Sequence, residues 1–210
     1  GNLILERLLA GETCALMSDA GMPAISDPGE DLVRLCHQNG VEVESVPGPS
    51  AITTALSIAG MPSGRFCFEG FLTTQKNGRK QHLESLKTES RTMIFFVVPH
   101  KLLATLKDML DTFGDRDIAV VRELTKLHET VFHTTLQGAL THYTENAPRG
   151  EFVLIINGAD EKQEEYTIDD ALKIAENLVK EGQSTSFAAK EAAKITGLKK
   201  SEIYKQLLSK

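Results

Sequence analysis

Residues 18–29 read SDAGMPAISDPG and directly follow the apolar run TCALM of residues 13–17. The two glycines of this stretch permit backbone conformations that other residues avoid, and its two prolines fix φ and push the preceding residues toward extended shapes. The order predicts a buried strand over 13–17 that runs into an irregular loop. Small ligands bind α/β proteins where strands end at the carboxyl edge of a parallel sheet, so the loop is a candidate binding site, with a plain tight turn as the alternative.

A second loop of this kind follows the next predicted strand, residues 41–46. It reads PGPSA over residues 47–51, and Ser50 is placed to cap a helix predicted over 51–59. A simple strand-to-helix turn would explain this loop on its own. Two successive loops nevertheless lie on the same edge of a parallel sheet, where backbone amides and a helix N-terminus can hold a ligand.

The rest of the chain alternates predicted strands and helices as far as residue 156, which indicates an α/β fold with largely parallel sheets. Strands are predicted over 65–69, 92–98, 117–121, 128–134 and 151–156, and helices over 3–9, 30–38, 80–86, 101–113 and 136–143. Beyond residue 160 the composition becomes polar, and helices are predicted over 168–180, 186–195 and 201–208. We therefore expect domains over 1–60, 61–159 and 167–210, with a linker over 160–166.

The composition argues against several classes of protein. The 210 residues carry a net charge of −6, so no global basic field attracts nucleic acid, and no apolar run approaches the length of a membrane span. The three cysteines (Cys14, Cys36 and Cys67) are far apart, which argues against a zinc site or a disulfide framework and fits a reducing cytoplasm. The sequence also lacks the motifs of NTPases, α/β-hydrolases and standard dinucleotide enzymes, and its histidines form no metal-ligand pattern.

Two further segments carry residues that could bind a ligand. Phe71, in the stretch FEGFL of residues 68–72, would pack in a core in most proteins, but its ring could also meet a flat adenine. The basic stretch that follows contains Lys76, Arg79 and Lys80, and it can be a solvated loop or a grip for phosphate. The residues alone leave both alternatives open.

The stretch RELTK of residues 122–126 ends the apolar strand predicted over 117–121. Polar side chains at such a place are costly to bury unless they are paired, so a surface ion pair is one interpretation. The other interpretation is catalytic, because a lysine held in a cleft of low dielectric can lose its proton and act as a base.

The C-terminal segment differs in charge from the rest of the chain. Between residues 184 and 210 six lysines stand against two acids, a local balance of +4 in an acidic protein. Small residues, a turn at Gly197 and a basic second helix resemble a helix-turn-helix, whose lysines would contact phosphates. A C-terminal helical cap with solvated lysines is the alternative.

Taken together, the stretches SDAGMPAISDPG, PGPSA, FEGFL and RELTK resemble the ribosomal RNA small subunit methyltransferase I family in order and spacing over nearly the whole chain. That family has the tetrapyrrole (corrin/porphyrin) methylase fold. The resemblance implies two α/β domains, the first truncated at its N-terminus, and a small all-helical C-terminal extension. It also implies a homodimer that uses S-adenosylmethionine (SAM) and no metal to methylate the 2′-hydroxyl of a cytidine in small-subunit ribosomal RNA, either naked or assembled.

The resemblance also assigns roles to residues. It implies a SAM pocket lined by Asp19, Ala20, Gly21, Pro23, Ile25, Ser26, Ser50, Ala51 and Phe71. A ribose hydroxyl is a poor nucleophile and needs a base or a hydrogen-bond acceptor, and we expect Lys126 or Glu123 in that role. RNA contacts are expected at Lys76, Arg79, Lys80, Arg122, Lys199 and Lys200.

The sequence departs from the family pattern at some places, and two other functions share part of it. The family's N-terminal strand with its Thr-Pro-Ile-Gly-Asn-Leu-type loop is absent, and Val97 stands where the family usually has Glu. A corrin or porphyrin C-methyltransferase would share the SAM loops but has no need of a lysine-rich tail. A non-catalytic nucleic-acid-binding protein would explain the tail but not the loops.

Overall fold

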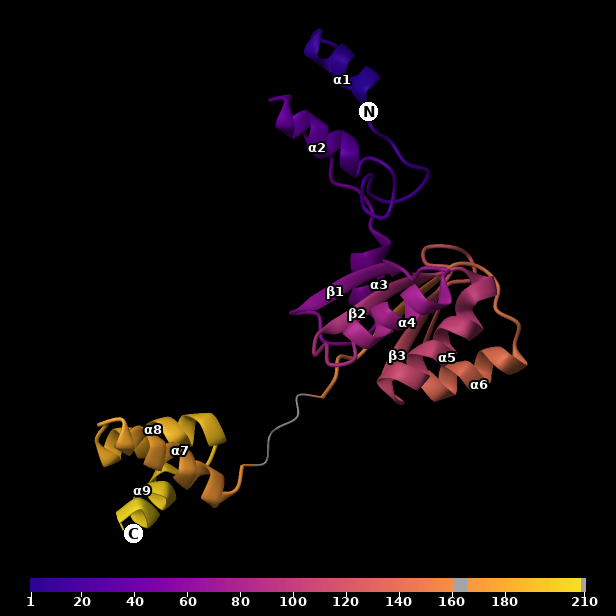
Figure 1. The fold of residues 1–210 in the computed structure, drawn as a ribbon. Helices are drawn as coiled ribbons and strands as arrows, with labels where there is room; N and C mark the ends of the chain where they lie inside the picture. The colour runs from indigo at the N-terminus through magenta and orange to yellow at the C-terminus, as the bar shows by residue number, and fades with distance from the viewer. Residues whose placement is uncertain (161–165, 209–210) are drawn as a thin grey trace. The chain divides into compact units, whose positions relative to one another are not determined.

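The computed structural model describes residues 1–160 and 166–208. The chain forms two compact units, Gly1–Asp160 and Glu161–Lys210 (Figure 1). The linker predicted over 160–166 falls largely on residues 161–165, which lie outside the described residues. The domain boundary predicted between residues 60 and 61 falls inside the first unit and stays a prediction.

The first unit contains the elements predicted from residue 65 onward, with boundaries shifted by a few residues. Its strands are β1 (Phe66–Phe71), β2 (Thr92–Val97), β3 (Asp117–Arg122), β4 (Thr130–Thr135) and β5 (Phe152–Ile156). Its helices are α1 (Asn2–Leu9), α2 (Glu30–Gln38), α3 (Ala51–Ile58), α4 (Lys76–Ser85), α5 (Leu102–Phe113) and α6 (Leu136–Glu145), with the 3-10 turn η1 (Pro99–Lys101) before α5.

The five strands form one mixed sheet in the order β1-β2-β5-β3-β4. Only β1 and β2 pair in parallel, so the predicted largely parallel sheet is wrong. A short loop joins β3 to β4, which forces β4 to run back beside β3, and β5 inserts between β2 and β3 and runs against both. As a result β1, β2 and β3 all end at one edge of the sheet, and β5 begins there.

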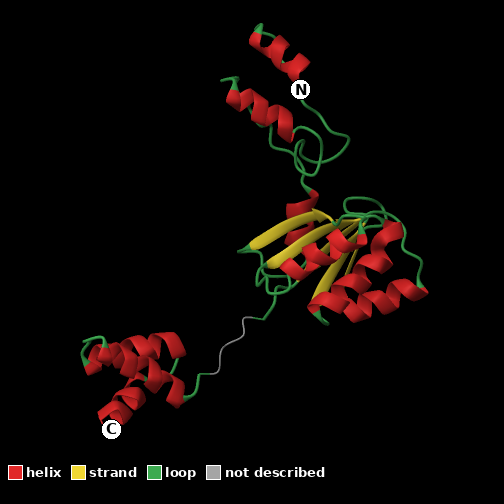
Figure 2. Ribbon diagram, viewed as in Figure 1, coloured by secondary structure: helices red, strands yellow, loops and turns green. Residues whose placement is uncertain are grey.

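The sheet is covered by helices on both faces, which makes three layers (Figure 2). Side chains alternate along each strand, so Met93 and Phe95 of β2 pack with α4, α5 and α6, while Ile94 packs with α3. The central strand β5 is buried along its whole length, as a strand covered on both faces must be. Burial of one large apolar side chain contributes roughly 1.5–3 kcal/mol to stability. Because many such side chains are buried on both faces of the sheet around β5, this region is the main source of stability of the unit.

The strands predicted over 13–17 and 41–46 are not formed. Both stretches are irregular in the structure, and nearly all their residues are exposed, Met17 by 85% and Val46 by 84%. An isolated strand leaves its backbone groups to water and gains no cross-strand contacts, and no described strand lies beside either stretch. The two strand predictions are therefore wrong, because an apolar run forms a strand only where a partner strand is available.

The second unit is a three-helix domain of α7 (Ile168–Lys180), α8 (Thr185–Thr196) and α9 (Lys200–Leu208). Alanines of α7 and α8 let these helices approach closely, and Leu172 and Ile203 complete the core. Gly197 ends α8 with a φ of 71°, a left-handed conformation that favours glycine, and turns the chain into α9. Within the described ranges of both units, no helix combines the length and apolarity that crossing a bilayer requires.

Candidate functional site

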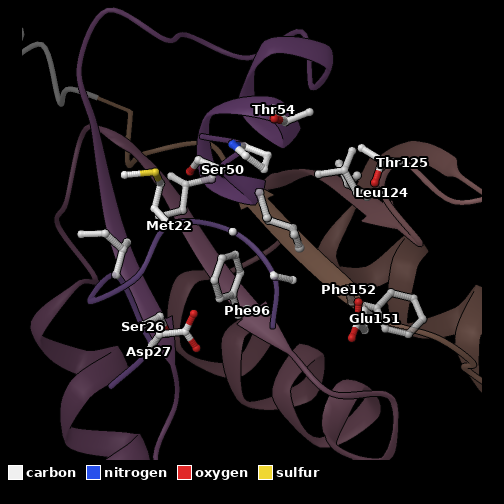
Figure 3. Close-up of a pocket in the computed structure, with 18 of the residues that line it drawn as sticks. Met22, Ser26, Asp27, Ser50, Thr54, Phe96, Leu124, Thr125, Glu151 and Phe152 are labelled. Atoms are coloured by element: carbon white, nitrogen blue, oxygen red, sulfur yellow. The ribbon is translucent and has the colours of Figure 1, made fainter. Parts of the chain in front are cut away.

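A pocket of about 540 Å³ lies in the first unit, at the sheet edge where β1, β2 and β3 end and β5 begins. Its walls come from both Gly/Pro loops, the start of α3 and the strand ends at this edge. In Figure 3, Phe96 lies in the middle of the view, with Ser26 and Asp27 on one side and Glu151 and Phe152 on the other. Small-molecule sites commonly measure about 300–1,000 Å³, so the pocket has the size of a ligand site.

The two Gly/Pro loops contact each other beside this pocket. A Cβ added to Gly21 would lie 3.9 Å from the carbonyl oxygen of Pro49, and one added to Gly48 would lie 3.3 Å from the sulfur of Met22. The φ of Gly21 is 78°, a conformation that other residues rarely adopt, so glycine is favoured at this position of the loop. The loops therefore form one continuous wall.

Backbone strain is concentrated in the loops that line the pocket. In the described part of the chain the non-glycine residues with positive φ are Ala24 (64°), Ser26 (60°), Glu123 (52°) and Thr125 (63°). Such conformations cost of order 1–3 kcal/mol each and persist where the surroundings hold a loop in a required shape. Two of these residues belong to the first Gly/Pro loop and two to the loop after β3, so both sides of the pocket are held in fixed shapes.

Ser50 occupies the N-cap position of α3, as predicted, with an extended backbone. Its side chain makes no capping hydrogen bond, which the sequence did not predict. Ser50 instead lines the pocket together with Ala51, Ile52 and Thr54 of the first helical turn. The Ser50 hydroxyl and the N-terminal backbone amides of α3 therefore lie at the pocket wall, where they can form hydrogen bonds with a polar group of a ligand.

Aromatic rings form an apolar wall of the pocket. Phe71 and Phe96 both line it, and their ring centroids are 5.5 Å apart in an edge-to-face arrangement. Phe68 packs behind Phe96 at 4.8 Å. Phe71 is 55% exposed, which is unusual for a phenylalanine at the end of a strand. The exposed ring can cover a flat apolar group in the pocket.

An ion-pair cluster lies at the edge of the pocket. Lys126 Nζ lies 3.1 Å from Glu123 Oε1 and 2.9 Å from Glu151 Oε2. Glu123 Oε1 also accepts a hydrogen bond from the backbone N–H of Glu151, at 2.8 Å. Lys126 and Glu151 line the pocket, whereas Glu123 lies beside it. The three side chains therefore hold one another in place across the ends of β3 and β5.

These contacts set the charge states of the cluster. The carboxylates of Glu151 and Glu123 raise the pKa of Lys126, so this lysine keeps its proton at neutral pH. The pKa of Glu123 is lowered, first by the hydrogen bond from the backbone of Glu151 and then by Lys126. Of the two interpretations of residues 122–126, the ion pair is formed in the structure, and the raised pKa of Lys126 is opposite to the shift that a base would need.

Most of the residues expected at a SAM pocket line this one. They are Ala20, Gly21, Ile25, Ser26, Ser50, Ala51 and Phe71, and of the two expected catalytic residues Lys126 does so. Asp19 and Pro23 belong to the first loop but do not line the pocket. Asp27 of the same loop lines the pocket, although it was not among the residues expected to bind SAM.

Phe96 and Glu151 line the pocket and were also missed by the sequence analysis. Phe96 lies in an apolar strand, and the sequence predicts that every side chain of such a strand packs in the core. Glu151 precedes β5, far along the chain from the loops, and the pair Gly150-Glu151 gives no recognisable motif. The register of the sheet, in which Arg122 pairs with Phe152, is what brings Glu151 to the pocket.

The basic residues expected to contact RNA differ in their surroundings. Lys76 and Lys80 are exposed on the first turns of α4, which starts at the same sheet edge as the pocket. Arg79 is paired with Asp108 at 2.6 Å and is 16% exposed, so it ties α4 to α5. Arg122 Nε is buried without a hydrogen-bond partner among the described residues. Unpaired buried donors are uncommon in folded proteins, and Arg122 does not line the pocket.

In the second unit, Lys199 and Lys200 are exposed at the turn into α9. Lys200 Nζ lies 3.3 Å from Ser186 Oγ and so bridges the starts of α8 and α9. Across both units, the described residues include no cluster of three or more His, Cys, Asp or Glu side chains suited to a metal ion.

Comparisons with known proteins agree with this arrangement. The model for Tetrapyrrole (Corrin/Porphyrin) Methylases matches residues 2–140, and the model for the RsmI C-terminal HTH domain matches residues 167–210. A ribosomal RNA small subunit methyltransferase I from Synechocystis is 42% identical over 203 residues, which cover 96% of this chain and 73% of that protein. The chain belongs to the ribosomal RNA small subunit methyltransferase I family. The family member from Xylella fastidiosa is 46% identical over 209 residues, covering 96% of this chain and 74% of its own.

Solved structures place this family member in the tetrapyrrole methylase fold. The methyltransferase CobJ superposes with a TM-score of 0.56 and 22% identity over 74% of this chain and 69% of its own. A Thermus thermophilus uroporphyrin-III C-methyltransferase, solved with S-adenyl homocysteine, gives a TM-score of 0.51 and 18% identity over 74% of this chain and 70% of its own. The predicted α/β fold of tetrapyrrole methylase type with a small helical C-terminal extension is thereby confirmed.

Proposed function

We propose that the chain transfers a methyl group from SAM to the ribose 2′-hydroxyl of a cytidine in small-subunit ribosomal RNA. The observation that carries the proposal is the pocket where two contacting Gly/Pro loops face an exposed aromatic ring and a charged edge. Relatives more than 40% identical over nearly the whole chain are named as methyltransferases of small-subunit ribosomal RNA, which supports the choice of substrate.

The lining of the pocket fits a nucleoside joined to an amino acid. Phe71 and Phe96 suit the flat adenine ring, while Ser26, Asp27 and Ser50 offer oxygen atoms to hydroxyl and amino groups. In SAM the methyl group is bonded to a positively charged sulfur, which is a good leaving group. Methyl transfer from this donor therefore needs no metal. The residues present therefore match the chemistry of this donor.

In this proposal Lys126 and Glu123 position the RNA substrate at the edge of the pocket. Lys126 carries its charge at neutral pH and lines the pocket, so it can orient an anionic or hydroxyl-bearing substrate. Glu123, with both its charge and its position fixed by hydrogen bonds, holds Lys126 in place. Transfer needs a hydroxyl oxygen roughly 3 Å from the methyl carbon, and such positioning accounts for much of the catalytic effect.

RNA phosphates in the proposal meet basic residues of both units. Lys76 and Lys80 are exposed on α4, which starts at the sheet edge of the pocket, so they can meet an anion. Lys199 and Lys200 mark the turn of the helix-turn-helix in the second unit. We further propose that two copies of the chain act as a homodimer in the cytoplasm, where ribosomal subunits are assembled.

A corrin or porphyrin C-methyltransferase is the second candidate, because solved enzymes of that class share the fold. Their identity to this chain is at most 22%, which supports the fold alone. The six lysines against two acids between residues 184 and 210 favour RNA, since a small tetrapyrrole substrate gives no reason for such a segment.

Replacement of Phe71 by alanine tests the pocket. Calorimetric titration with S-adenosylhomocysteine should give a dissociation constant about tenfold higher for Phe71→Ala than for wild type, a loss of about 1.4 kcal/mol, because the aromatic cover is removed. Phe66→Ala is the matched control, since Phe66 lies on the same strand, is 37% exposed and does not line the pocket. Absence of binding heat with the wild-type protein would contradict the proposed function itself.

A further inference from the structure

Glu151 lies where two strand ends meet. It immediately precedes β5, and the pairing of Arg122 with Phe152 places it beside the end of β3. Its backbone is fixed on both sides, because its carbonyl accepts from Glu123 N at 3.0 Å and its N–H donates to Glu123 Oε1 at 2.8 Å. Its side chain is nevertheless 81% exposed and lines the pocket. A fixed backbone thus presents an exposed carboxylate at the pocket edge.

The two carboxylates of the cluster differ in availability. Glu123 is 20% exposed and does not line the pocket, and its Oε1 accepts hydrogen bonds from both Lys126 Nζ and the Glu151 backbone, so it is the less accessible carboxylate. For Glu151 the described residues supply one side-chain partner, Lys126 Nζ, at 2.9 Å from Oε2. The remaining lone pairs of Glu151 face solvent and the pocket, where a substrate hydroxyl can reach them.

We infer that Glu151 is the catalytic acceptor that receives a hydrogen bond from the substrate hydroxyl and takes up its proton during methyl transfer. This inference rests on the proposed function. The hydroxyl oxygen forms a bond to the methyl carbon as the carbon–sulfur bond breaks, the electron pair of that bond stays on sulfur, and the hydroxyl proton moves to a Glu151 oxygen. Proton transfer to a positioned group of this kind accelerates reactions typically by about 10²–10⁴-fold.

Lys126 and Glu123 are positioning residues in this arrangement. Lys126 bridges the two carboxylates, so it fixes the Glu151 side chain from one oxygen and leaves the other free. Glu123 anchors both the lysine and the Glu151 backbone. Lys126 therefore lies between the carboxylates of Glu123 and Glu151.

The first experiment compares Glu151→Gln with Glu84→Gln. Glu84 is a matched control because it also pairs with a lysine, Lys87, at 3.2 Å, is 54% exposed and does not line the pocket. With small subunits as substrate, Glu151→Gln should lower kcat by about 100-fold or more and leave KM for SAM within about twofold. Glu84→Gln should keep wild-type kinetics, and calorimetry with S-adenosylhomocysteine should give wild-type affinity for both variants.

The second experiment measures binding without turnover. With S-adenosylhomocysteine present, wild-type protein should bind RNA bearing a ribose hydroxyl at the methylated position about tenfold more tightly than the same RNA with deoxyribose there, because a hydrogen bond to a charged acceptor is lost. Glu151→Ala should bind the two RNAs equally, and Glu84→Ala should keep the preference. A merely structural role of Glu151 would weaken both RNAs alike.

Wild-type kcat in Glu151→Gln, or an unchanged hydroxyl preference in Glu151→Ala, would overturn the inference and leave the proposed function standing. Failure of the wild-type protein to bind S-adenosylhomocysteine or to methylate the subunit would instead remove the proposed function on which the inference rests.

Discussion

Glu89 and Arg91 form a two-pronged ion pair in the turn before β2, with Nε–Oε1 at 2.9 Å and Nη2–Oε2 at 2.6 Å. The backbone N–H of Arg91 also donates to Glu89 Oε1, at 2.8 Å. These hydrogen bonds lower the pKa of Glu89 to about 2. The Glu89 carbonyl in turn accepts from Ala159 N, so this pair fixes the turn beside the chain that leaves β5.

The lowered pKa of Glu89 predicts a pH dependence of stability. Its ordinary value is 4.5, so the pair stabilises the fold fully above that pH, and the contribution is lost as pH falls toward about 2. The difference in unfolding free energy between wild type and Glu89→Gln should therefore be larger at about pH 6 than at about pH 3, measured by urea denaturation. An equal difference at both pH values would contradict this assignment.

At the scale of residues, the sequence predicted the parts of the pocket that lie in local motifs. The Gly/Pro loops supply Gly21 and Ser50 because composition alone makes these segments irregular and places them after apolar runs. Glu151 could not be predicted, because its place depends on the pairing of β5 with β3 across some thirty residues. The sequence left Lys126 open between an ion pair and a base, because its two carboxylate partners depend on the fold.

At the scale of elements, α7 shows how local chemistry fixes a helix boundary. Thr167 Oγ1 accepts from Asp170 N at 3.3 Å, and the Asp170 carboxylate accepts from Thr167 N at 3.1 Å, which completes a capping box. The pKa of Asp170 is lowered first by a hydrogen bond from the Thr167 hydroxyl to its carboxylate, at 2.6 Å, and then by the one from Thr167 N. The bounds of α7 agree with the predicted 168–180 because such signals are contained within a few residues.

Loss of this cap should destabilise the second unit. Thr167→Ala removes the acceptor for Asp170 N and should cost about 1 kcal/mol, seen as a lower midpoint in thermal unfolding followed by circular dichroism. Thr167→Ser keeps a hydroxyl and should behave as wild type. Equal midpoints for all three proteins would show that the cap contributes nothing.

Strand pairing, by contrast, could not be predicted. The apolar runs identified β1, β2, β3 and β5 within a few residues, since a buried strand has a local signature. The direction of a strand and the identity of its neighbours have no such local signature. The sequence predicted β5 as part of a parallel sheet, but β5 runs antiparallel to both β2 and β3. The stretches over 13–17 (TCALM, apolar) and 41–46 (VEVESV, alternating) also have strand patterns, and both remain unpaired.

At the scale of the whole molecule, the two units have separate cores. The sheet clusters of the first unit contain no residue of α7, α8 or α9, and the core of the second is made entirely by these helices. The change from an acidic α/β segment to a lysine-rich helical one predicted this separation. Because the pocket lies wholly in the first unit, we propose donor binding there, whereas the proposed RNA contacts lie on both units.

Removal of residues 161–210 should separate donor binding from methylation of the RNA. The shortened protein should bind S-adenosylhomocysteine with wild-type affinity, because every pocket residue is retained, and should lose methylation of small subunits. Calorimetry and a methyl-transfer assay measure the two. Wild-type methylation by the shortened protein would contradict a role of the second unit in RNA binding and favour a tetrapyrrole substrate.

The central place of β5 also governs how the first unit is made. β5 is the last strand to leave the ribosome, yet it joins β2 to β3, so until residue 152 emerges the nascent chain holds two half-sheets, each with an open edge. Open edges bind other chains readily, and late long-range pairing slows assembly. Chains that terminate before β5 are therefore prone to aggregate, even though they contain both loops of the pocket.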